Sequence, residues 1–203
     1  MSPIRINYWA EGATDRAAAR KMISHAGGEP GADYSGRRRA SPGKDYLDQR
    51  IASFNSAAHF SPWFVLRDSD GECAAGLATQ LLAQPAEKMC LRIVVPTIEA
   101  WLLADREAFA INLAVAADRL PTDPEGIANV KGCMMELARR SRSRAVREDL
   151  LPDPRSGRRV GPGYAQFLIQ FINDSWRPLR AATNAPSLDR AMMRLATLVT
   201  SSH

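Results

Sequence analysis

The chain has 203 residues, and its 27 Lys and Arg residues against 22 Asp and Glu residues give a net charge of +5. That length suits one domain, or one domain with an added lobe, and can bury a sizeable core. The composition is 45% hydrophobic and 24% charged, and no apolar run approaches the roughly 20 residues of a membrane span. These features argue against a membrane protein and against a disordered chain.

In the first half of the chain, strands alternate with helices. Short apolar runs that end at glycine or acidic turns predict the strands, and apolar residues at helical spacing predict the helices. In chain order we expect a strand at residues 4–10, a helix at 15–25, a Gly- and Pro-rich loop at 27–43, a helix at 45–58, a strand at 62–66, a helix at 73–82, a strand at 90–95 and a helix at 98–105. Such alternation requires crossover connections, which predicts an α/β fold with a mostly parallel sheet flanked by helices.

Beyond residue 105 the pattern is helical alone. We expect helices at residues 107–117, 131–140, 163–176 and 187–200, separated by turns that contain proline. The sequence therefore predicts two parts, an α/β core at residues 1–105 and a helical, Arg-rich extension at residues 106–203 packed on that core.

The cysteines and the first residues of the chain bear on its compartment. The three cysteines are scattered and odd in number, which indicates neither a disulfide framework nor a zinc site; they are Cys73, Cys90 and Cys133. Residues 1–6 lack the apolar core and cleavage site of a secretory signal. We therefore expect a cytoplasmic protein.

The positive charge is concentrated in two segments. Residues 131–160 carry nine Lys and Arg against four Asp and Glu, an excess equal to the net charge of the whole chain. A second group, Arg37 to Arg39 with Lys44, falls in or beside the predicted loop. Because a guanidinium binds phosphate through two hydrogen bonds, the first segment predicts a phosphate-contacting surface made of Lys131, Arg139, Arg142, Arg144, Arg147, Arg158 and Arg159. The alternative is a solvated helix face whose charges pair locally.

Carboxylates follow each of the three predicted strands. Glu11 follows the first, Asp68 and Asp70 follow the second, and Glu99 comes soon after the third. The carboxyl ends of parallel strands meet at one edge of a sheet, so we expect these side chains to converge. Their mutual repulsion requires a bound cation or retained protons. Oxygen ligands favour Mg²⁺ or Mn²⁺, so all four are candidate metal ligands and catalytic residues.

Each carboxylate also has a purely structural interpretation. Glu11 and Gly12 form a turn in that view, Asp68 to Gly71 form an Asx turn, and Glu99 is an early-turn acid favoured by the helix dipole. The recurrence of acids after three successive strands is harder to explain in this way than any single one.

Two of these motifs carry a resemblance to a known family. A strand followed by Glu11-Gly12-Ala13-Thr14-Asp15, and a later strand followed by Asp68-Ser69-Asp70, resemble the Toprim domain, the metal-binding α/β module of primases, type IA and II topoisomerases and small nucleases. The Glu-Gly-x-Thr-Asp form is most similar to the nuclease branch, which includes the overcoming-lysogenization-defect nucleases. The resemblance covers residues 4–105.

A looser similarity extends further along the chain. The run from Glu99 to Asp105, then Pro124-Glu125 and Lys131, is similar to a Toprim-like family encoded near bacterial phage-defence genes. No motif of the helical half is attached to a known activity, so the resemblance does not transfer a substrate.

The Toprim resemblance implies a Mg²⁺- or Mn²⁺-dependent nuclease, a hydrolase acting on DNA or RNA in phage defence. In such nucleases the first Glu is a general base or metal ligand and the aspartates hold metal, roles that pass to Glu11, Asp68 and Asp70 and less directly to Glu99. A non-catalytic or partner-activated subunit of an ATPase-containing defence complex is the alternative, because the chain has no phosphate-binding loop of its own. Phosphotransfer on a nucleotide or small phosphoester is a third possibility.

Overall fold

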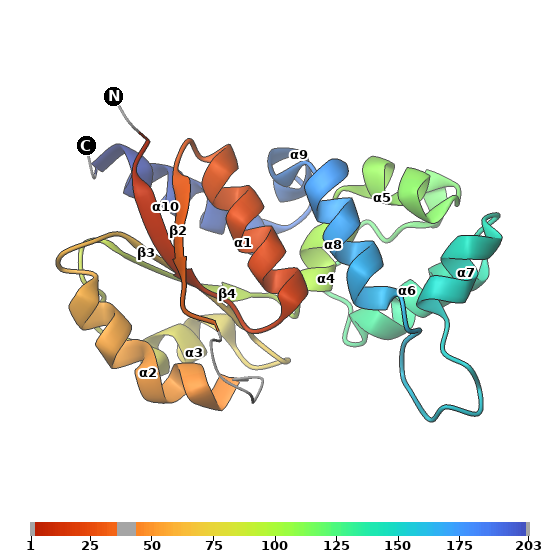
Figure 1. Cartoon of the computed structure of the whole chain (residues 1–203), viewed down its shortest axis with the longest axis horizontal. Coiled ribbons are helices and arrows are strands. Elements are labelled where there is room, and N and C mark those ends of the chain that lie inside the picture. Colours follow the sequence, from red (N-terminus) through yellow and green to blue (C-terminus); the bar gives the residue numbers. More distant parts are fainter. Residues whose placement is uncertain (1–2, 36–43, 202–203) are drawn as a thin grey trace.

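The computed structural model describes residues 3–35 and 44–201 (Figure 1). Four strands form one sheet in the order β2-β1-β3-β4, and every neighbouring pair is parallel. The strands are β1 (Arg5–Trp9), β2 (Glu29–Asp33), β3 (Trp63–Asp68) and β4 (Met89–Val94). The prediction of an α/β fold with a mostly parallel sheet and C-terminal helices is confirmed.

Helices cover both faces of the sheet because its central strands are apolar on both sides. On β3, Phe64 and Leu66 pack into the larger core with α1 (Ala13–His25). Trp63 and Val65, which point the opposite way, pack against α2 (Lys44–Ala57). Helix α3 (Ala74–Leu81) packs against β4 and lies on the same side of the sheet as α2 (Figure 1).

The remaining helices follow β4. They are α4 (Ile98–Ala104), α5 (Arg106–Leu113), the 3₁₀ turn η1 (Ala117–Arg119), α6 (Val130–Arg139), α7 (Arg144–Leu150), α8 (Tyr164–Asp174), α9 (Pro178–Ala182) and α10 (Pro186–Ser201). None of the helices in the described ranges is long and apolar enough to cross a membrane.

The C-terminal helices share a hydrophobic core with the sheet. This core runs from Ile6 in β1 to Val199 in α10. Helix α8 lies along α1, and α10 lies against β4 (Figure 1). Across the junction the indole N–H of Trp101 donates a hydrogen bond of 2.7 Å to the Ser187 hydroxyl. The extension therefore packs on the sheet domain, and the boundary at residue 105 stays a prediction.

Strand β2 lies inside the segment predicted as a loop, so that prediction is wrong for residues 29–33. The sequence gives no signal for this strand, because Glu29-Pro30-Gly31-Ala32-Asp33 contains no β-branched or aromatic residue. Proline is tolerated here because β2 is an edge strand. A Cβ on Gly31 would lie 3.0 Å from the Ile6 carbonyl oxygen, so glycine permits this close approach to β1. Residues 37–39 of the same segment lie outside the described residues.

Candidate functional site

The predicted acidic residues lie at the carboxyl edge of the sheet, where the chain order reverses. Strand β1 has β2 on one side and β3 on the other, and ligands of open α/β sheets bind at such a switch point. Trp9 pairs with Val65 in β3, so Glu11 and Asp68 follow that pair by two and three residues. Asp68 in turn pairs with Val94 at the end of β4. The three acid-bearing strand ends are therefore adjacent, because the unpredicted β2 lies outside them.

Asp15, in the first turn of α1, joins this edge and is buried, with 8% of its surface exposed. Burial raises the pKa of Asp15, and the charges of Glu99 and Glu11 raise it further, while the N–H groups of Asp15 and Gly12 act in the opposite direction. A Cβ on Gly12 would lie 2.7 Å from Asp15 Oδ2. Glycine after Glu11 therefore leaves the space that the Asp15 carboxylate occupies.

Asp68, the last residue of β3, has the most perturbed carboxylate of the edge. Its pKa is raised to about 9, mostly by burial and also by the charges of Asp15, Glu99, Glu11 and Asp70, in that order. Its Oδ1 is buried and has no hydrogen-bond partner among the described residues. We call Glu11, Asp15, Asp68 and Glu99 the carboxylate cluster, because these four side chains act on one another electrostatically.

Glu99, in the first turn of α4, is held by two side chains of the helical extension. It is 5% exposed. The Tyr164 hydroxyl of α8 donates to Glu99 Oε1 at 3.2 Å, and Lys131 Nζ of α6 lies 3.5 Å from the same oxygen. Burial raises the pKa of Tyr164, and so does the neighbouring Glu99, which keeps this hydroxyl protonated as a donor.

Asp70 lies at the margin of the cluster. Its backbone is left-handed, with φ of 50°, and its exposed carboxylate faces cations: Oδ2 lies 3.3 Å from Lys44 Nζ and 3.5 Å from the buried Arg67. Among the four charges that raise the pKa of Asp68, that of Asp70 contributes least. The Asp70 N–H donates to the Pro96 carbonyl at 3.2 Å, which ties this turn to the connection between β4 and α4. Asp70 thus belongs to a turn that supports the edge.

The donor atoms do not stand as a complete set of metal ligands. Within residues 3–35 and 44–201, no group of three or more His, Cys, Asp or Glu side chains is arranged so that it could hold a metal ion. The structure brings Glu11, Asp68 and Glu99 to one edge and adds Asp15, whereas Asp70 faces Lys44 and Arg67.

Most residues of the predicted phosphate-contacting surface lie away from this edge. Lys131 is the exception, because it pairs with Glu99. Arg139 pairs with Glu136, Arg144 pairs with Glu148 at 2.7 Å, and Arg147 donates to the Ser141 carbonyl. These local contacts match the alternative of a solvated helix face. Arg142, Arg158 and Arg159 are exposed, and helix α7 with the loop after it projects at the end of the molecule farthest from the sheet (Figure 1).

Sequence reasoning did not select Asp15 or Tyr164. A signal for Asp15 was present, since it follows Glu11 by four residues and opens a predicted helix. No local signal existed for Tyr164, because 65 residues separate it from its partner Glu99.

Comparison with known proteins identifies no relative. The chain matches no protein-family model and no curated protein, and it matches no solved structure. The resemblance to Toprim domains therefore rests on the Glu11-Gly12 and Asp68 to Asp70 motifs themselves.

Proposed function

We propose that the carboxylate cluster binds Mg²⁺ or Mn²⁺ and that the protein hydrolyses phosphodiester bonds in nucleic acid. The observation that carries this proposal is the Asp68 side chain, whose Oδ1 is buried and unpartnered among the described residues while the charges of four other carboxylates act on it. A buried carboxylate in that setting is stabilised by a proton or by a cation. The Toprim resemblance supports the second of these, because its acidic motifs end two neighbouring strands.

The donor set fits a hard divalent cation. Mg²⁺ in phosphoryl-transfer sites is commonly held by one or two carboxylates, with water and substrate oxygens completing the shell, so a cage of three protein ligands is not required. Asp68 and Asp15 are the residues we assign to hold it, with Glu99 beside them. When bound, such an ion supplies Lewis-acid polarisation of a phosphoryl oxygen and lowers the pKa of a coordinated water.

The remaining residues contact the substrate or accept the proton of the attacking water. Glu11 is partly exposed at the end of β1, so water reaches its carboxylate, which can accept a proton from the attacking water. The exposed ammonium of Lys131 beside Glu99 can contact a phosphate oxygen on which negative charge develops. Tyr164 fixes Glu99 through its hydrogen bond.

A cleavage assay tests this function. Purified protein is incubated with single-stranded and duplex DNA and RNA in Mg²⁺, in Mn²⁺ or in EDTA. We expect metal-dependent cleavage that falls about 10²-fold or more in Glu11→Gln and in Asp68→Asn. Asp118→Asn, at an exposed aspartate of η1, is the matched control and should cleave like wild type. Equal cleavage by all variants would contradict the proposal, and cleavage only after addition of an ATPase partner would favour the partner-activated alternative.

A further inference from the structure

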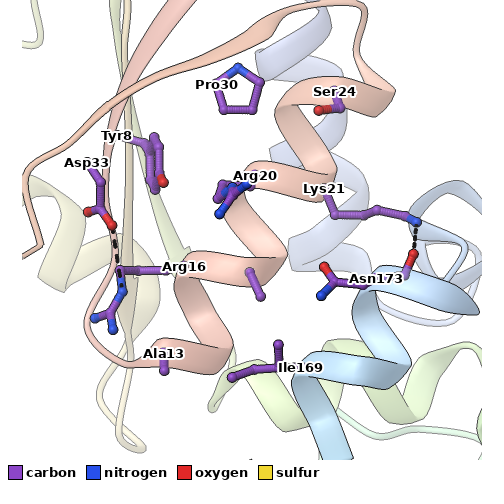
Figure 2. A pocket seen from close by; sticks show the side chains of 11 residues that line it. Tyr8, Ala13, Arg16, Arg20, Lys21, Ser24, Pro30, Asp33, Ile169 and Asn173 are labelled. Carbon is purple, nitrogen blue, oxygen red and sulfur yellow. Dashed lines mark hydrogen bonds and ion pairs between the residues drawn. The ribbon is translucent and has the colours of Figure 1, made fainter. Parts of the chain in front are cut away.

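A second feature of the molecule is a basic groove between α1, β2 and α8 (Figure 2). Its volume is about 380 Å³, within the range of ligand sites. We call it the α1 groove; the charged and polar residues that line it are Tyr8, Arg16, Arg20, Lys21, Ser24, Asp33 and Asn173. Three cations therefore line it against one carboxylate, which makes it a site for an anion.

The cations differ in how they are partnered. Arg16 Nε lies 3.7 Å from Asp33 Oδ2, and Lys21 Nζ donates to the Asn173 carbonyl at 2.8 Å, as Figure 2 shows. No ion pair among the described residues involves Arg20, which is exposed. The Tyr8 hydroxyl lines the same groove; burial and the charge of Asp33 raise its pKa, and the positive charges of Arg20 and Arg16 act in the opposite direction. Arg20 thus offers an uncompensated guanidinium beside a hydroxyl, a pair suited to a phosphate.

None of the four side chains of the carboxylate cluster lines the groove, but the groove reaches the first turn of α1, which follows Glu11 in the chain. Ala13 lines it and lies two residues after Glu11, and Arg16 follows Asp15 directly on the same helix. Arg16, Arg20 and Ser24 recur every four residues along α1, so successive side chains are about 6 Å apart along the axis. A chain of phosphates that leaves the cluster can therefore follow α1 from one donor to the next.

We propose that the α1 groove binds the backbone of a single-stranded nucleic acid next to the phosphodiester bond that is cleaved. This proposal rests on the proposed function, because it assigns the substrate of the same site. A duplex is bound by elements that project into its grooves, whereas here the protein is hollowed between a helix, a strand and a second helix (Figure 2). An extended strand fits that hollow.

The test is oligonucleotide binding by the full chain, measured by fluorescence anisotropy in EDTA so that metal-dependent cleavage does not occur. The probes are fluorescein-labelled single-stranded DNA and RNA of about 12 nucleotides. We expect Arg20→Glu to weaken binding about tenfold or more and to reduce the slope of log affinity against log salt by about 0.7 or more, the effect of losing one or more phosphate contacts. Arg190→Glu is the control, since Arg190 is an exposed arginine of α10, the helix that packs on β4 at the other edge of the sheet. It should bind like wild type, and both variants should melt like wild type.

Each outcome is decisive for one of the two proposals. Unchanged binding by Arg20→Glu, or equal loss in both variants, overturns the groove proposal, as does a wild-type protein that binds no oligonucleotide. Competition by a nucleoside monophosphate as strong as that by the unlabelled oligonucleotide also overturns it and indicates a small phosphoester ligand. If Arg20→Glu alone loses oligonucleotide binding while neither wild type nor any variant cleaves nucleic acid in the cleavage assay, the groove proposal is supported and the nuclease function is contradicted.

Discussion

At the scale of single residues, Asp68 combines two unfavourable conditions. It is substantially withdrawn from water, and other carboxylates surround it, so both burial and repulsion raise its pKa above the ordinary value of 3.8. The folded state holds this proton more tightly than the unfolded state. The contribution of Asp68 to stability is therefore fully present below pH 3.8. Its contribution to stability is then lost progressively as the pH rises toward about 9.

Replacing Asp68 by Asn tests this dependence. Without divalent cations, we expect Asp68→Asn to melt at a higher temperature than wild type at alkaline pH and to lose part of the pH dependence, because the amide carries no charge. At this chain length each kcal/mol corresponds to about 2–4 °C in Tm. Thermal melts across the pH range provide the measurement, and Asp118→Asn should follow wild type. A variant less stable than wild type at alkaline pH would show that the Asp68 charge is compensated in the fold.

Gly12 is the second residue whose role is testable. In Gly12→Ala the new Cβ would meet Asp15 Oδ2 at 2.7 Å, so the carboxylate must move. We expect the free energy of unfolding to fall by about 1–3 kcal/mol and divalent-cation affinity to fall with it. In the control Gly76→Ala, inside α3, the nearest atom is Cys73 Cβ at 3.8 Å, so this change should not destabilise. Wild-type cation affinity in Gly12→Ala would remove Asp15 from the binding site.

At the scale of elements, α6 and α8 connect the helical extension to the site. The Tyr164 hydroxyl is a hydrogen-bond donor to a buried carboxylate, and such bonds to charged groups contribute about 1.5–3 kcal/mol. We expect Tyr164→Phe to lose stability of that order, measured by denaturant unfolding. In the cleavage assay we expect the variant to change kcat, by lowering it, more than it changes KM. Tyr46→Phe, at a half-exposed tyrosine of α2, should change neither. An unchanged kcat in Tyr164→Phe would limit α8 to a structural role.

Elements with a strong local signal were predictable from the sequence. Strands β1, β3 and β4 have buried central residues, so they are apolar runs that can be recognised in the sequence. The long helices can be recognised by the helical spacing of their apolar residues. Strand β2 was not predictable because backbone pairing with β1 holds its polar residues at the sheet edge. Helices α7 and α9 are short and were not predicted: α7 buries only Leu150, and α9 has five residues. Helix α4 has the same length as α7 but was predictable, because it is an apolar run that is buried throughout.

The residues of the candidate site were also predictable only where the sequence carries a local signal. Glu11, Asp68 and Glu99 could be located because the end of a parallel strand fixes where the next residues lie. The orientation of Asp70 toward Lys44 and Arg67 depends on a left-handed turn and on α2, neither of which the spacing of the motif encodes.

At the scale of the whole molecule, the charge is divided between regions. The carboxylate cluster occupies one edge of the sheet, and the α1 groove reaches the first turn of the helix that follows Glu11. Helix α7 and the loop after it, which carry the exposed Arg144, Arg158 and Arg159, project at the far end of the molecule (Figure 1). A phosphate chain close to the cluster would meet Lys131 and the α1 groove before it met the arginines of that distant segment. The positive charge behind the net value of +5 is therefore not gathered on a single face of the molecule.

The most direct measurement is calorimetric titration of the protein with Mn²⁺ at neutral pH. We expect one class of site in wild type and a loss of affinity of about tenfold or more in Asp68→Asn, since one of the one or two carboxylates that commonly hold such an ion is removed. Binding should release protons, mainly from Asp68, whose raised pKa of about 9 keeps it protonated at neutral pH in the absence of the cation. Absence of Mn²⁺ binding to wild type, or equal binding to Asp68→Asn, would contradict a divalent-cation site in the carboxylate cluster.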